Sequence, residues 1–172
     1  MKKLFEIKVC GINDLISMDA AINNSVDYIG LVFYKDSPRN ISISNAKILI
    51  RNRPEKIKIV ALTVNPSDNF LIEIKKNIKP DFIQLHGEED PYRCKNIREK
   101  FNIPLIKGIG IENDTNINYL IKPYEEICDI LILDAPSKNL PGGNGKKFDW
   151  KILKNYKSKK KWMLAGGLNI NN

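Results

Sequence analysis

The chain contains little cysteine and almost no histidine. Three cysteines and one histidine occur among its 172 residues. The cysteines, Cys10, Cys94 and Cys128, are odd in number and show no paired, metal-type spacing. This pattern argues against a disulfide framework and against a zinc site. We therefore predict that all three are reduced thiols.

Long apolar runs are absent from the sequence as well. No stretch approaches the roughly 20 apolar residues that a membrane-spanning helix needs. The N-terminal segment has two lysines, but Glu6 and Lys8 interrupt any apolar core of a signal peptide. We therefore expect no contact with a membrane and a cytoplasmic location.

Acidic residues are outnumbered by basic ones. Lys and Arg total 28 and Asp and Glu total 20, which gives a net charge of +8. The lysines are scattered and accompany no nucleic-acid-binding motif. We interpret them as a solvated surface whose positive field attracts an anionic small molecule, and we expect no nucleic-acid partner. A basic binding module remains an alternative.

Short apolar runs alternate with segments of helical spacing, as in repeated βα units. Seven runs are predicted to be strands: Leu4–Gly11, Tyr28–Phe33, Ile57–Val64, Phe82–His86, Leu105–Gly110, Ile130–Asp134 and Trp162–Leu168. About six helices are expected between them, one of which begins at the strong capping pair Asp90-Pro91. Nearly continuous apolar strands are typical of parallel sheets buried on both faces. The pattern favours an α/β fold, either a doubly wound sheet or a (β/α)8 barrel, in a single domain over residues 1–172.

The chemically distinctive residues collect where predicted strands end, which is where parallel α/β folds place their functional sites. They are Cys10, Arg39, His86, Asp134, Gly166 and Gly167. Each residue taken alone is also compatible with a structural role. For example, Cys10 could be a small buried hydrophobe, and His86 could be a packed core residue.

The loop Pro141–Lys147 is long and rich in glycine. It lacks the spacing of a phosphate-binding P-loop, because Lys147 stands where that motif has Ser or Thr. We interpret the loop as a mobile lid over an active site, with a flexible surface loop as the alternative.

Five blocks in order along the chain resemble the phosphoribosylanthranilate isomerase family. They are Lys8-Val9-Cys10-Gly11-Ile12; Gly30–Phe33 with Ser37–Ser42; Gln84–Glu89; Leu133-Asp134 with Gly142–Trp150; and Leu164–Leu168. Together these blocks cover essentially the whole chain, which makes the resemblance specific, whereas any one of them alone would not be.

The resemblance implies a (β/α)8 TIM barrel and an Amadori rearrangement in tryptophan biosynthesis. N-(5-phosphoribosyl)anthranilate would become 1-(2-carboxyphenylamino)-1-deoxyribulose 5-phosphate, with no metal or cofactor. The matching positions make Cys10 the general base and Asp134 the general acid. The substrate would be an anion with two charged ends, and the protein would act as a monomer or homodimer. The implied substrate-binding residues are Arg39 at the carboxylate, Gly166 and Gly167 at the phosphate, and His86 at the mouth of the site.

The family's eighth strand and final helix have no counterpart in the sequence. We therefore expect a barrel that lacks its C-terminal end, with weakened closure and phosphate binding. A non-catalytic remnant of the family is one alternative. A sister phosphosugar isomerase of the histidine pathway is another, although that family uses a pair of carboxylates and Cys10 argues against it.

Overall fold

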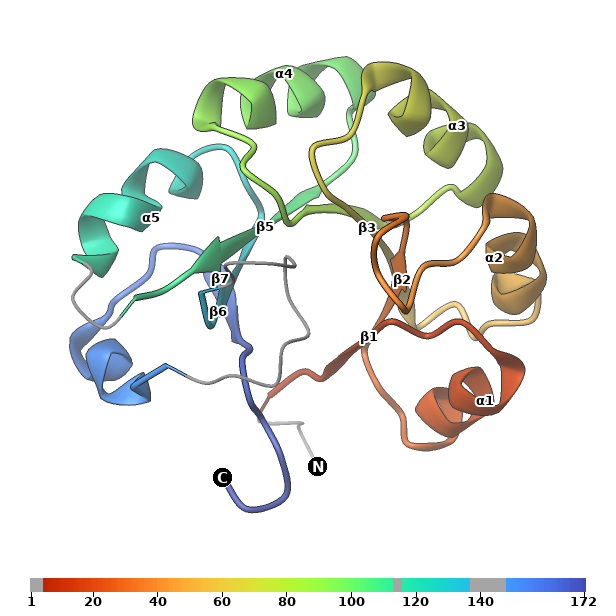
Figure 1. The fold of residues 1–172 in the computed structure, drawn as a ribbon, viewed down its shortest axis with the longest axis horizontal. Coiled ribbons are helices and arrows are strands. Elements are labelled where there is room, and N and C mark those ends of the chain that lie inside the picture. Colours follow the sequence, from red (N-terminus) through yellow and green to blue (C-terminus); the bar gives the residue numbers. More distant parts are fainter. Residues whose placement is uncertain (1–4, 113–115, 137–147) are drawn as a thin grey trace. The chain divides into compact units, whose positions relative to one another are not determined.

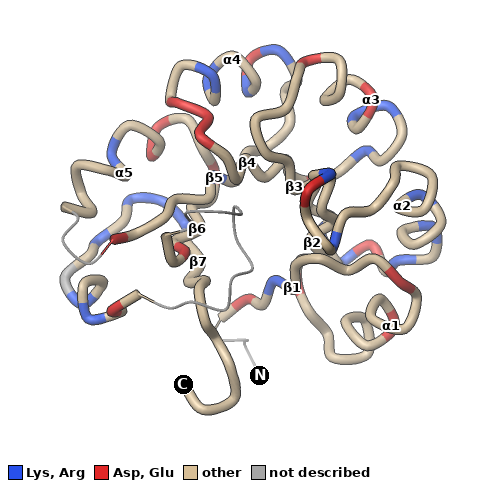
Figure 2. Tube along the Cα trace, in the orientation of Figure 1, with Lys and Arg blue, Asp and Glu red and all other residues tan. Residues whose placement is uncertain are grey.

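A computed structural model of the chain describes residues 5–112, 116–136 and 148–172. The chain divides into two compact units, residues 1–83 and residues 84–172. In each unit, strands alternate with helices along the chain (Figure 1). Lys and Arg are interspersed with Asp and Glu along the helices and loops of both units (Figure 2). This distribution agrees with the interpretation of the lysines as part of a mixed, solvated surface.

The first unit contains three parallel strands in the order β1-β2-β3. The strands are β1 (Lys8–Cys10), β2 (Tyr28–Val32) and β3 (Lys58–Thr63), and the helices are α1 (Leu15–Asn23), α2 (Ile43–Ile50) and α3 (Asp68–Ile78). Each helix begins at a side chain that accepts a hydrogen bond from a backbone N–H of the first turn, namely Asp14, Ser42 and Ser67. Such caps satisfy donors that have no partner within the helix.

The core of the first unit forms where the apolar stripes of its helices meet the strands. Ile29 and Ile59 on the strands are almost fully buried, as are Met18, Ala46 and Ile74 on the three helices. Burial of such side chains is worth about 1.5–3 kcal/mol each for the larger ones. This packing holds the carboxyl ends of β1 and β2 in place.

The second unit repeats the same alternation. Its first strand, β4 (Phe82–Leu85), crosses the boundary between the two compact units. The elements that follow are α4 (Pro91–Phe101), β5 (Leu105–Gly110), α5 (Ile117–Glu125), β6 (Ile130–Asp134), the 3-10 helix η1 (Trp150–Asn155) and β7 (Lys161–Leu164). Strands β5, β6 and β7 pair in parallel, and Gly110 lies opposite Asp134. Residues 130–133 are all buried, as their continuous apolar character predicted.

All seven predicted strands are present, and the capping pair at the start of α4 is confirmed. Five strands are shorter than predicted, three of them by only one or two residues, and the first and the last by more. The first begins only at Lys8, because the N–H of Ile7 donates to the Asp27 carboxylate instead of extending the strand. The last ends at Leu164, because Gly166 and Gly167 adopt positive φ angles of 85° and 68°. The backbone turns at these two glycines.

The sixth predicted helical segment, η1, is a 3-10 helix, so the described residues contain five α-helices. No helix within residues 5–112, 116–136 and 148–172 is long and apolar enough to cross a membrane. The predicted lid, Pro141–Lys147, lies outside the described residues.

Candidate active site

Cys10 ends β1 in the first unit, and its thiol lies against Gly30 of the neighbouring strand. A Cβ atom added to Gly30 would lie 2.7 Å from Cys10 Sγ and 3.0 Å from Lys8 Nζ. Glycine at this position therefore leaves the space that the thiol and the ammonium group occupy. The thiol and the ammonium group lie on the same side of β1.

Arg39 reaches the same strand end from the loop after β2. Its Nη1 donates a hydrogen bond to the carbonyl oxygen of Cys10 at 3.1 Å. Its side chain passes over Gly11, where an added Cβ would lie 2.4 Å from Arg39 Cδ. Gly11 also has a φ of +91°, which side chains disfavour. The structure thus brings Cys10 and Arg39 together, with Gly11 providing both the turn and the space.

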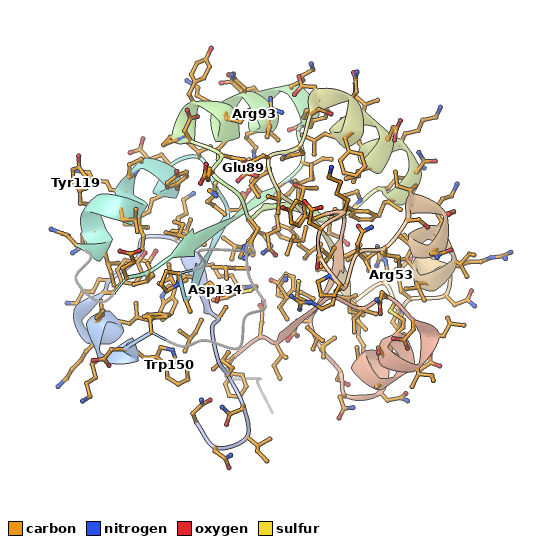
Figure 3. All side chains as sticks on the ribbon, viewed as in Figure 1. Arg53, Glu89, Arg93, Tyr119, Asp134 and Trp150 are labelled. Carbon is orange, nitrogen blue, oxygen red and sulfur yellow. The ribbon has the colours of Figure 1, made fainter. Side chains whose placement is uncertain are left out.

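Asp134 lies at the carboxyl end of β6 in the second unit (Figure 3). Its Oδ1 accepts a hydrogen bond from the N–H of Ala135 at 2.8 Å. Its Oδ2 lies 3.5 Å from Nε2 of His86, and both side chains are largely buried, with exposed fractions of 16% and 9%. The predicted acid and the single histidine of the chain therefore face one another.

His86 is held from two sides within this unit. The amide nitrogen of Gln84 lies 3.1 Å from Nδ1 of the ring. The ring also lies against Gly108 of β5, where an added Cβ would be 2.0 Å from Nδ1. Glycine at position 108 is therefore a requirement for the observed place of the imidazole.

A buried ion pair supports the loop that follows His86. Lys107 Nζ lies 3.1 Å from Glu89 Oε2, and the two side chains are 4% and 2% exposed. The same ammonium donates to the carbonyl oxygens of Leu85 and Gly87, at 3.4 and 2.8 Å, and Glu89 accepts from the N–H of Gly87 at 2.9 Å. Glu89 lies in the loop just before α4 (Figure 3). The pair thus binds the backbone on both sides of His86.

Gly166 and Gly167, the predicted phosphate residues, follow β7 and come close to Asp134. A Cβ added to Gly166 would lie 2.7 Å from the Ala135 nitrogen and 3.1 Å from Asp134 Oδ1. The carbonyl oxygen of Gly167 accepts hydrogen bonds from the side chains of Asn169 and Asn172. A side chain at position 166 would therefore collide with Ala135 and with the Asp134 carboxylate.

The other two cysteines are buried in the second unit, away from the ends of the strands. Cys94 lies on α4 and Cys128 precedes β6, and both are free thiols. A hydrogen bond with Cys94, together with burial, raises the pKa of the Cys128 thiol. Cys94 and Cys128 thus interact with each other in the interior, whereas Cys10 is half-buried at the end of β1.

Sequence reasoning did not single out Lys8, Gly30 or Gly108. Glycines inside strands are a signal that another group approaches the backbone closely, and Gly30 and Gly108 both fit that rule. Lys8 could have been noticed because it lies two residues before Cys10, and alternate residues of a strand share a face.

The sequence comparisons agree on one family. The family described as N-(5'phosphoribosyl)anthranilate (PRA) isomerase matches residues 7–172 of the chain. An N-(5'-phosphoribosyl)anthranilate isomerase of Paramagnetospirillum magneticum is 40% identical over 166 residues, which are 95% of this chain and 77% of that protein.

Solved structures agree with the sequence matches. The phosphoribosyl anthranilate isomerase of Thermotoga maritima superposes with a TM-score of 0.85 at 28% identity, over 98% of this chain and 80% of the other. A phosphoribosyl anthranilate isomerase in complex with reduced 1-(o-carboxyphenylamino)-1-deoxyribulose 5-phosphate gives a TM-score of 0.82 at 28% identity, over 98% and 79% of the two chains. The expected TIM-barrel fold class, rather than a doubly wound sheet, is thereby confirmed.

Proposed function

This chain belongs to the N-(5'-phosphoribosyl)anthranilate isomerase family, and we propose that Cys10 and Asp134 are the base and the acid of its reaction. The enzyme is an isomerase of tryptophan biosynthesis that converts N-(5-phosphoribosyl)anthranilate to the 1-deoxyribulose ketoamine by an Amadori rearrangement. Family membership selects this substrate over that of the histidine-pathway alternative. The observation that supports the acid role is the position of the Asp134 carboxylate, which is largely buried at the end of β6.

Asp134 acts in the first step, the opening of the sugar ring. The bond between C1 and the ring oxygen breaks, and the ring oxygen takes the proton of the Asp134 carboxylic acid. The electron pair of the amino nitrogen forms a C1=N double bond, so the sugar becomes an open-chain iminium ion. The Asp134 carboxyl group is largely buried at the end of β6, where Oδ1 accepts the N–H of Ala135.

Cys10 acts in the second step, the removal of the proton from C2. The thiolate takes this proton, the C2–H electrons form a C1=C2 double bond, and the C=N electrons return to nitrogen. The enol then becomes the ketone as its hydroxyl proton passes to the Asp134 carboxylate and C1 takes the proton held by the Cys10 thiol. Both residues return to their starting forms, so the sum is an isomerisation. The thiol lies beside Gly30, on the same side of β1 as the ammonium of Lys8.

The remaining site residues bind an anionic substrate that carries a carboxylate and a phosphate. Arg39 binds the anthranilate carboxylate, since a guanidinium presents two parallel donors to such a group. The backbone N–H groups near Gly166 and Gly167 bind the phosphate, and His86 lines the site. The protein works in the cytoplasm, as a monomer or homodimer, without a cofactor.

Turnover of purified variants tests these roles. Cys10→Ala and Asp134→Ala are each expected to lose about 10²- to 10⁴-fold in kcat, the usual contribution of a general acid or base. Cys94→Ala, which removes a thiol that takes no part in the reaction, is the matched control and is expected to retain kcat. Circular dichroism establishes that each variant is folded. Full activity of either site variant would refute its assigned role, and an inactive wild-type chain would favour the non-catalytic alternative.

A further inference from the structure

We propose that Gln84 is a positioning residue that sets the tautomer of His86, so that the ring presents an Nε2–H to the carboxylate of Asp134. This inference rests on the proposed function, because it gives His86 a task in the proton donation by Asp134. It adds two residues to the machinery of the reaction, Gln84 and Gly108, neither of which touches the substrate.

The first step of the argument is the contact between Gln84 and the ring. The Gln84 amide nitrogen lies 3.1 Å from His86 Nδ1. With the amide nitrogen turned toward the ring, the NH₂ group donates this hydrogen bond and Nδ1 accepts it. A neutral imidazole with an accepting Nδ1 carries its proton on Nε2. The contact therefore selects one of the two neutral forms of the ring.

The second step is the direction in which Nε2 points. It lies 3.5 Å from Asp134 Oδ2, and the other carboxylate oxygen accepts the Ala135 N–H at 2.8 Å. The two oxygens of Asp134 thus face two N–H donors. Catalytic hydrogen bonds are often long before substrate binds and shorten in the complex, so a separation of 3.5 Å suits a contact that tightens during the reaction.

The third step is the change of charge at Asp134. When Asp134 gives its proton to the ring oxygen of the sugar, it becomes an anion. Hydrogen bonds to a charged acceptor are roughly twice as strong as those to a neutral one. The Nε2–H of His86 therefore stabilises the product side of the proton transfer more than the starting state, and this difference is what accelerates a reaction.

The fourth step is the rigidity of the ring. Gly108 has no side chain, and the His86 ring lies in the space that a Cβ would fill, because such a Cβ would be 2.0 Å from Nδ1. Lys107 and Glu89 bind the carbonyl oxygens of Leu85 and Gly87 and the N–H of Gly87. The backbone before and after His86 is therefore held by a buried ion pair, and the ring cannot turn away from Asp134 without breaking its contact with Gln84.

The ring-nitrogen signals of a ¹⁵N-labelled protein test the tautomer directly. His86 is the only histidine of the chain, so the spectrum needs no assignment. At a pH where the signals no longer change, the wild-type ring is expected to be the Nε2–H form. Gln84→Glu places a carboxylate, which only accepts, opposite Nδ1, and is expected to move the proton to Nδ1. A wild-type ring in the Nδ1–H form would overturn the proposal.

Kinetics of the same variants test the consequence. Gln84→Glu is expected to lower kcat about 10- to 100-fold, the loss of a hydrogen bond to a charged group, while KM changes little. Gln84→Met, which neither donates nor accepts at Nδ1, is expected to give mixed tautomers and a smaller loss. Asn118→Asp adds the same charge at an exposed position of α5 and is expected to change neither the tautomer of His86 nor kcat.

The positioning role of Gln84 can be refuted without refuting the acid role of Asp134. If Asp134→Asn abolishes turnover but both Gln84 variants keep the wild-type kcat, the positioning role is overturned and the acid role of Asp134 stands. If Asp134→Asn remains fully active, the acid role is overturned, and the positioning role falls with it whatever tautomer the spectrum reports.

Discussion

Removing one partner of the buried pair Lys107–Glu89 should destabilise the protein strongly. Both side chains are almost completely buried, at 4% and 2% exposure, with 3.1 Å between Nζ and Oε2. Glu89→Gln leaves the ammonium in the interior with neutral partners, among them the Leu85 and Gly87 carbonyl oxygens, and with no carboxylate. Breaking a buried pair from one side costs about 3–5 kcal/mol, because an uncompensated charge remains. This is a large share of a typical stability of about 5–15 kcal/mol.

A double-mutant cycle in urea at neutral pH measures this effect. Glu89→Gln and Lys107→Met are each expected to lower the free energy of unfolding by about 3–5 kcal/mol. The double variant removes both charges, so it should lose less than the sum by at least about 1 kcal/mol. The urea dependence of the unfolding free energy should stay unchanged if the native state keeps its compactness.

The neighbouring pair Lys95–Glu99 on α4 is the matched control. Its atoms are 3.9 Å apart and its side chains are 63% and 64% exposed. Glu99→Gln is expected to cost only a few tenths of a kcal/mol, because exposed pairs are screened by water and salt. The reasoning would be refuted if Glu89→Gln cost no more than Glu99→Gln, or if the effects of the two buried substitutions simply added.

Three further predictions follow from other contacts. Gly30→Ala should lower kcat, because the added Cβ would lie 2.7 Å from Cys10 Sγ and displace the thiol; an unchanged kcat would contradict this. Gly11→Ala should cost about 1–3 kcal/mol for its positive φ and raise KM by displacing Arg39, as kinetics and urea unfolding would measure. Burial raises the pKa of Tyr124 to about 12, so the folded state holds a proton that the unfolded state loses from about pH 10. Stability should therefore fall between about pH 10 and 12, and less steeply in Tyr124→Phe.

Much of the fold could be predicted because it depends on local signals. The alternation of β-branched runs with amphipathic segments located seven strands, and Asp90 with Pro91 located the start of α4. The strand ends were less certain, because they depend on partners. Ile7 leaves the first strand since its N–H finds the carboxylate of Asp27, twenty residues away. A pattern of apolar residues does not contain that information.

The candidate site was predictable as a set of residues but not as a set of contacts. By itself the sequence determined that Cys10 and Asp134 end strands and that His86 lies at the end of β4, where it follows the last strand residue, Leu85. Strand length and turn residues are encoded locally. Which groups face them depends on the register between strands, and register is set by the packing of the whole sheet. Only the tertiary structure decided that the Cys10 thiol lies against Gly30 and that the His86 ring lies against Gly108, since each contact joins residues from different βα units.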